Sequence, residues 1–184
     1  MRVHDKHGMD STRLLALQAF TSLIAWTLVA WVVVAPWARG RPLHRALAVV
    51  MLPLAFRGLG ATMLSEQVVR PTLDAGFARH VAIGDGVTVM LAVIAIVLLA
   101  GRRRGSLGAA WLANVVGLAD LLFNLASGAR IGVADHVGAQ WFVLAFGVPG
   151  MAVVHGTALW ILIRHRRGRG DPDRPETPTT DHDL

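Results

Sequence analysis

Five apolar runs, each long enough to cross a bilayer as a helix, constrain this chain more than any other feature. They extend over residues 14–36, 43–65, 79–100, 107–127 and 138–163. A helix rises about 1.5 Å per residue, so roughly 20 residues span a hydrocarbon core of about 30 Å. Only short loops remain between the runs in a chain of 184 residues. We therefore predict an all-α integral membrane protein, a single bundle of five transmembrane helices.

Composition supports this class and excludes several functions. The chain is 54% hydrophobic and 16% charged, with a mean hydropathy of +0.51, whereas soluble domains carry about 25% charged residues. Cysteine is absent, which removes disulfides, thiolate metal sites and cysteine nucleophiles. The net charge of +6 lies mainly in loops and the tail, so it indicates topology rather than a nucleic-acid surface. We expect the lipid bilayer as a partner, and no nucleic acid and no metal.

The distribution of basic residues predicts the orientation. Six Lys and Arg lie on the amino-terminal side of the bundle and eleven on the other, so the positive-inside rule predicts an external amino terminus and a cytoplasmic carboxyl terminus. Residues 1–13 would be a short external tail, and residues 164–184, basic and then acidic, a disordered cytoplasmic tail. Abundant Arg, Ala, Val and Gly are typical of proteins encoded by GC-rich bacterial genomes. A plasma (inner) membrane of bacteria is thus the predicted location.

Three ionisable residues interrupt the apolar runs. Arg57, Asp85 and Asp120 lie within the second, third and fourth runs. A charge in hydrocarbon costs about 2.5 kcal/mol or more, so such residues face a partner or a cavity. Counting about 1.5 Å per residue puts all three near one level, about 10 Å beneath the outer surface. We therefore expect them to meet inside the bundle.

Helical spacing places each charge on a face with small residues, where membrane helices approach closely. A milder polar face occurs in the first run. The predicted faces are Gln18, Ser22, Ala25 and Val29; Ala46, Val50, Pro53, Arg57, Gly60 and Leu64; Val81, Asp85, Thr88, Ala92 and Ala95; and Ala113, Gly117, Asp120, Asn124 and Ser127.

The charge balance of this cluster suggests a function. One guanidinium cannot neutralise two carboxylates, so a proton, a cation or a cationic solute must complete the site. We predict a proton-, cation- or small-solute-binding or transport component in which Asp85 and Asp120 bind the ligand. Arg57 would set the proton affinity of the two carboxylates, and Asn124 and Thr88 would complete the shell around the ligand. Five helices make a thin wall for a pathway, which predicts a homo-oligomer or a larger membrane complex.

His155 is a further candidate binding residue in the fifth run. It follows Pro149, which should kink the helix and with Gly147 and Gly150 form a hinge or a cavity lining. With His44 it could ligate haem, but His44 lies at the membrane edge and a second axial pair is missing. No cofactor is predicted.

Two other functions remain open. The buried charges could only specify helix packing, in a non-catalytic membrane scaffold or accessory subunit. Alternatively the carboxylates could serve a membrane-embedded enzyme acting on a lipid, which a groove opening sideways between helices 79–100 and 107–127 would favour. The chain contains no metalloprotease, phosphate-loop, nucleophile-elbow or dinucleotide motif, so no catalytic residue is predicted.

Overall fold

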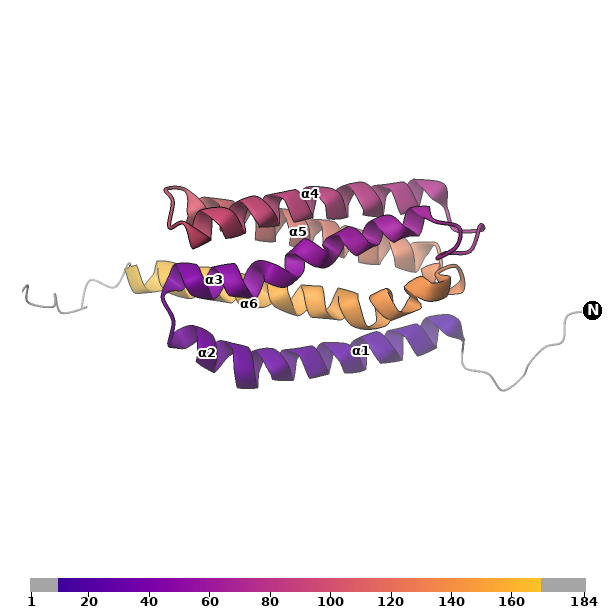
Figure 1. Ribbon diagram of the computed structural model, residues 1–184. Helices are drawn as coiled ribbons and strands as arrows, with labels where there is room; N and C mark the ends of the chain where they lie inside the picture. The colour runs from indigo at the N-terminus through magenta and orange to yellow at the C-terminus, as the bar shows by residue number, and fades with distance from the viewer. Residues whose placement is uncertain (1–9, 170–184) are drawn as a thin grey trace, which may run out of the picture.

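The structure, a computed structural model, describes residues 10–169, which form an antiparallel bundle of helices without strands (Figure 1). Five helices are long and apolar enough to cross a membrane: Ser11–Arg39, Leu43–Leu64, Ala75–Ala100, Ser106–Arg130 and Gly138–Arg167. The predicted number and order of helices are therefore confirmed. Helical structure begins at Ser11 and continues to Arg169, whereas the sequence predicted a tail over residues 1–13 and disorder from residue 164. The remainder of the predicted tails, residues 1–9 and 170–184, lies outside the described residues.

Several of the long helices change their winding along their length. The first comprises α1 (Ser11–Val29), the π-helical η1 (Ala30–Val34) and α2 (Ala35–Arg39). The second comprises α3 (Leu43–Met51) and the 3-10 helix η2 (Leu52–Leu64). The third and fourth are α4 (Ala75–Ala100) and α5 (Ser106–Arg130). After η3 (Val133–Asp135), the fifth comprises η4 (Gly138–Gln140), the π-helical η5 (Val143–Gly147) and α6 (Val148–Arg169).

Two prolines explain the two π-helical turns. Pro36 and Pro149 each stand two positions after the last residue of a π segment. Because proline has no N–H, it cannot make the α-helical hydrogen bond four residues back, and the preceding turn widens. Thus Ala35 donates to the Ala30 carbonyl and Val148 to the Val143 carbonyl, five residues back in both cases. The irregularity expected at Pro149 is a π turn.

The long 3-10 segment η2 decides which residues of the second helix are buried. Pro53 removes a backbone donor at its start. With three residues per turn, positions three apart share one face, and Leu54, Arg57, Gly60 and Met63 are the buried residues of η2. The predicted α-helical face was correct for Arg57 and Gly60. It was wrong for Leu64, which is 59% exposed, and Pro53 is only half-buried.

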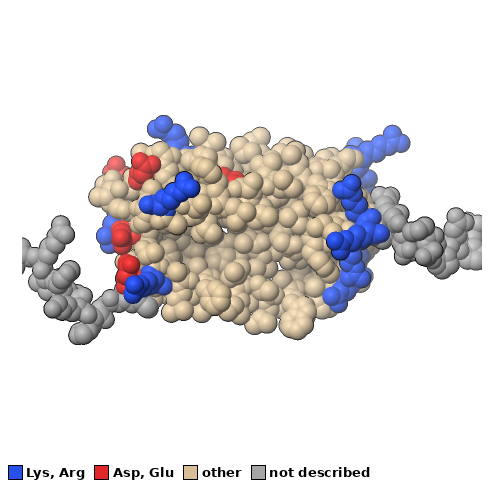
Figure 2. All heavy atoms as spheres, turned by 180° about the vertical axis from the view of Figure 1, so that it is seen from behind, with Lys and Arg blue, Asp and Glu red and all other residues tan. Residues whose placement is uncertain are grey.

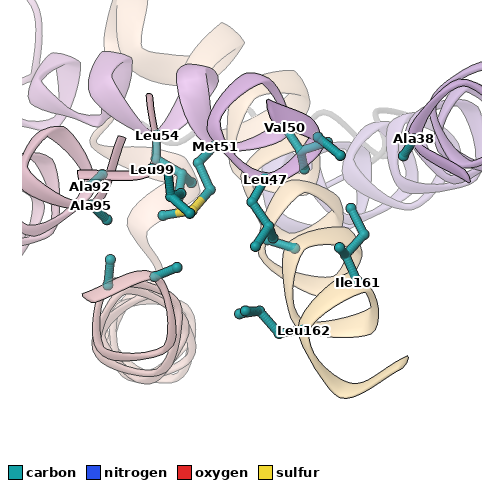
Figure 3. Close-up of a cluster of buried hydrophobic side chains, with 14 residues drawn as sticks. Ala38, Leu47, Val50, Met51, Leu54, Ala92, Ala95, Leu99, Ile161 and Leu162 are labelled. Atoms are coloured by element: carbon teal, nitrogen blue, oxygen red, sulfur yellow. The ribbon is translucent and has the colours of Figure 1, made fainter. Parts of the chain in front are cut away.

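The hydrophobic core lies in the half of the bundle where α3, α4, α5 and α6 meet. Leu47 and Met51 point from α3 toward the other helices, near Leu99 and Leu162 (Figure 3). The helices approach closely at fully buried alanines, as small residues allow; these are Ala92, Ala95, Ala110, Ala113 and Ala158. On α4 the predicted face of Val81, Asp85, Thr88, Ala92 and Ala95 is buried throughout.

The first long helix is peripheral. No residue of α1 is buried, and this helix packs mainly against η5 and α6. Two indole groups hold it there: Trp26 Nε1 donates to the Phe146 carbonyl at 3.1 Å, and Trp141 Nε1 donates to Gln18 Oε1 at 2.6 Å. Gln18, Ala25 and Val29 are exposed, so the milder polar face expected in this helix is not buried, although Gln18 contacts Trp141.

The surface is divided into three zones along the bundle (Figure 2). A tan middle zone without visible basic groups separates two charged ends. One end carries both acidic and basic groups, and the other carries only basic ones. The exposed large hydrophobic residues include Phe20, Trp31, Phe56, Met90 and Leu125.

Candidate functional site

The guanidinium of Arg57 joins the third and fourth long helices to the second. Its Nε and Nη2 atoms lie 2.7 and 2.6 Å from Asp85 Oδ1, and Nη2 also lies 2.6 Å from Asp120 Oδ2. The Arg57 side chain is only 2% exposed, and those of Asp85 and Asp120 are 13% and 11% exposed. The three charges predicted to meet therefore do meet, inside the bundle.

The other nitrogen of the guanidinium completes its hydrogen bonding. Arg57 Nη1 donates to the Gly117 carbonyl at 2.6 Å and lies 3.3 Å from His155 Nε2. Arg57 makes four hydrogen bonds within the cluster, from all three of its nitrogen atoms. The side chain is thus held in one position by α4, α5 and α6 together.

The contact with Arg57 fixes the tautomer of His155. A guanidinium donates and never accepts, so His155 Nε2 must be the acceptor and its proton must lie on Nδ1. That atom lies 3.0 Å from Asn114 Oδ1, which accepts it. Asn114 Nδ2 in turn donates to the Ala110 carbonyl at 2.8 Å and lies 3.5 Å from Met51 Sδ. His155 is therefore a neutral link in a chain of hydrogen bonds.

Three glycines on three helices make room for these side chains. A Cβ added to Gly60 would overlap the Asp85 carboxylate, and one added to Gly84 would overlap the Asp120 carboxylate. At Gly117 it would lie 2.6 Å from His155 Cε1. Atoms this close cannot coexist without movement, so polar groups here rest directly on the backbone of a neighbouring helix.

Two of the predicted shell residues differ in their roles. Asn124 Nδ2 donates to Asp120 Oδ2 at 3.1 Å, so it belongs to the cluster. The Thr88 hydroxyl instead donates to the Gly84 carbonyl within its own helix at 2.9 Å, and its methyl group faces Gly117. Thr88 is therefore a packing residue in this structure rather than part of the polar shell.

Sequence reasoning missed two buried amides. Asn114 is fully buried and supports His155; a lone amide one turn before Gly117 in an apolar run was the available signal. Gln140 is also buried, and its Nε2 donates to the Thr62 hydroxyl and to the Leu59 carbonyl at 3.3 Å. Its position at the start of the fifth apolar run concealed its role in joining η4 to η2.

The cluster forms one side of a large cavity. This cavity, about 590 Å³ in volume, lies between α1 and η5 on one side and η2, α4 and α5 on the other. It falls within the range of about 300–1,000 Å³ found for small-molecule sites. Among its lining residues, only Thr12, Arg57, Asp85 and Asn124 have polar side chains. Seen from behind, the tan middle zone is correspondingly hollowed (Figure 2).

The groove that would favour a lipid-modifying enzyme was expected between helices 79–100 and 107–127. There α4 and α5 pack against each other, and residues of both helices line the cavity. Within residues 10–169, no group of three or more His, Asp or Glu residues could hold a metal ion. The carboxylates of the cluster surround a guanidinium instead.

Comparison with known proteins gives one result. Residues 14–163 match the model of a family described as a domain of unknown function, DUF8737. The chain belongs to this family. The matched range includes every residue of the cluster and nearly all of the cavity lining. No curated protein and no solved structure matches the chain.

Proposed function

We propose that this DUF8737 protein is a multi-pass membrane component that binds a proton, a cation or a small solute at the Arg57, Asp85 and Asp120 cluster. The observation that carries the proposal is a pair of buried carboxylates on one guanidinium, beside a cavity. Since His155 is neutral, the cluster has one positive and two negative groups. A proton or a cation is the complement that this charge balance requires.

The proposal includes a location and an orientation in the membrane. Among residues 10–167, nine arginines and no carboxylate lie at one end of the bundle; they are Arg39, Arg41, Arg45, Arg102, Arg103, Arg104, Arg164, Arg166 and Arg167. At the other end four arginines mix with Asp10, Glu66, Asp74 and Asp135. This asymmetry supports a cytoplasmic carboxyl terminus, an external amino terminus and insertion into a bacterial plasma membrane.

The two carboxylates have different places in the proposed mechanism. Asp85 lines the cavity and Asp120 does not. A ligand in the cavity would therefore contact Asp85, while Asp120 keeps Arg57 in position and balances its charge. Transport requires a complete path, which predicts a homo-oligomer or a larger membrane complex.

The test compares Asp85→Asn and Asp120→Asn with Asp135→Asn, an exposed carboxylate at the end of the bundle. Each purified variant is heated in nanodiscs with increasing methylammonium chloride or potassium chloride. A ligand that binds only the native state raises the unfolding midpoint with concentration. We expect this increase in the unmodified protein and in Asp135→Asn, and its loss in Asp85→Asn. An equal response in all variants would contradict the proposal.

One observation favours a second function, a scaffold or accessory subunit. All three nitrogen atoms of Arg57 already have acceptors within the protein, as in a network that only specifies packing. In that case Asp120→Asn and Asp85→Asn would lower stability, and neither cation would change the unfolding midpoint of any variant.

A further inference from the structure

The cavity has a polar floor in one place and apolar walls elsewhere. Its floor is formed by Asp85 and Asn124, next to Arg57. The walls are side chains of Leu, Val, Met and Phe from both sides, with Phe56, Phe77 and Phe142 among them. A molecule that filled this space would therefore need a small polar end and a larger apolar body.

The floor presents an open carboxylate oxygen. Arg57 donates hydrogen bonds to Asp85, Asp120, Gly117 and His155. Asn124 donates to Asp120, and its Oδ1 atom is buried too deeply for an occupant to reach. No side chain or backbone group within residues 10–169 donates to Asp85 Oδ2. The polar end of an occupant must consequently donate hydrogen bonds.

The charge of the cluster further restricts the chemical class of the occupant. The cluster combines one guanidinium with two carboxylates, and the neutral imidazole of His155 adds no positive charge. Hydrogen bonds between an ammonium and a carboxylate are shorter and about twice as strong as those between neutral groups. A positively charged donor is thus the best complement to this floor.

The mouth of the cavity lies in the apolar zone of the surface. Phe56, Leu122 and Leu125 line the cavity and are more than half exposed, at 67%, 56% and 61%. In the proposed membrane position these side chains face lipid, away from either charged end. A ligand dissolved in the bilayer would reach the cavity sideways.

We propose that the cavity binds an amphiphile with a protonated amine head and an apolar body, which enters from the bilayer. The amine lies against Asp85, and the apolar body lies between α1 and α5. This inference rests on the proposed function and names the class of solute. A lipid acyl chain would leave Asp85 Oδ2 without a donor, and so would a helix of a second copy, whose backbone N–H groups bond internally.

The experiment uses three probes of equal chain length. Decylamine, decanol and decanoate are titrated into phosphatidylcholine nanodiscs that contain the full chain, and native mass spectrometry counts the molecules retained per protein. We expect one decylamine per chain, bound at least about tenfold more tightly than decanol, as a charge-assisted hydrogen bond implies. Decanoate should not be retained. Equal retention of all three, or a retained phospholipid that decylamine does not displace, would overturn the inference.

Two matched variants locate the site. Leu125→Trp fills the mouth of the cavity. Val115→Trp introduces the same side chain at an exposed position of the same helix outside the cavity. Leu125→Trp should reduce decylamine binding at least about tenfold, and Val115→Trp should leave it unchanged. Equal effects of the two variants would show that decylamine binds elsewhere.

Methylammonium distinguishes the failure of this inference from the failure of the proposed function. If methylammonium stabilises the protein through Asp85 but decylamine binds no better than decanol, the cluster binds a small cation and the amphiphile inference is wrong. If methylammonium, potassium and decylamine all lack an effect that Asp85→Asn removes, both proposals are wrong.

Discussion

The carboxylate of Asp85 lies against Gly60, and a methyl group added to the α-carbon of Gly60 would overlap Asp85 Oδ2. Gly60 belongs to η2, one 3-10 turn after Arg57. The same short segment therefore supplies the guanidinium that binds this carboxylate and the open space that admits it.

Gly60→Ala should destabilise the protein by about 1–3 kcal/mol, because the new methyl group forces Asp85 away from Arg57. Gly58→Ala is the matched control, since a Cβ there meets no atom within 4 Å. Thermal unfolding in detergent measures both. A midpoint for Gly60→Ala equal to that of Gly58→Ala would contradict the close contact.

A second glycine pair tests the other carboxylate. Gly84→Ala would overlap Asp120, whereas Gly86→Ala, half a turn away on the same helix, meets nothing within 4 Å. We expect Gly84→Ala to lower the unfolding midpoint. Gly86→Ala should leave it unchanged or raise it slightly, because alanine is favoured over glycine within a helix by up to about 1 kcal/mol. The reverse order would show that Asp120 is not seated against Gly84.

Removal of Arg57 should cost more than removal of either carboxylate. Arg57→Gln leaves two buried carboxylates without a cation, and breaking a buried pair in this way costs about 3–5 kcal/mol. Asp120→Asn leaves one carboxylate with the guanidinium, so the charges balance, and the loss should be nearer about 1 kcal/mol. Unfolding midpoints of the two variants, measured at one pH, give the order. A less stable Asp120→Asn would show that the pair of carboxylates is not an excess of negative charge.

The hydrogen-bond chain predicts one tautomer for His155. Nitrogen-15 NMR of the labelled protein should show a proton on Nδ1 and none on Nε2, and His155→Gln identifies the signal by its loss. Asn114→Leu should destabilise the protein by about 1–3 kcal/mol, because it leaves a buried Nδ1–H group without an acceptor. A signal with the proton on Nε2 would contradict the contact with Arg57.

The absence of cysteine permits a direct test of orientation. Single cysteines at Thr72 and at Arg103, which lie in loops at opposite ends of the bundle, are labelled in intact cells with a membrane-impermeant maleimide. We expect labelling at Thr72 from outside, and at Arg103 only after the cells are opened. The opposite pattern would reverse the proposed topology.

The sequence predicted the helices and the meeting of charges because both depend on simple quantities. Run length determines whether a helix can span a bilayer, and the cost of an isolated charge in hydrocarbon brings Arg57, Asp85 and Asp120 together. On α4 the ordinary α-helical spacing held, so the buried face was predicted correctly.

Other features depend on geometry that residue types do not encode alone. The change to 3-10 winding after Pro53 moved Leu64 to the surface and Met63 to the interior. The cavity lies where η5 packs against the peripheral α1 and leaves space beside η2 and α5. Asn114 was missed because its role appears only when α5 and α6 are packed, with His155 beside it.

The thirteen-residue segment Leu52–Leu64 would become shorter and would rotate if its winding changed from 3-10 to α. A 3-10 helix rises about 0.5 Å more per residue than an α-helix and turns about 20° further. Rewinding the segment as an α-helix would retract its far end by about 6 Å and swing Arg57 about 60° relative to Leu54. Such rewinding would change the direction of the Arg57 side chain relative to both carboxylates, whereas the fully buried alanines lie on α4, α5 and α6.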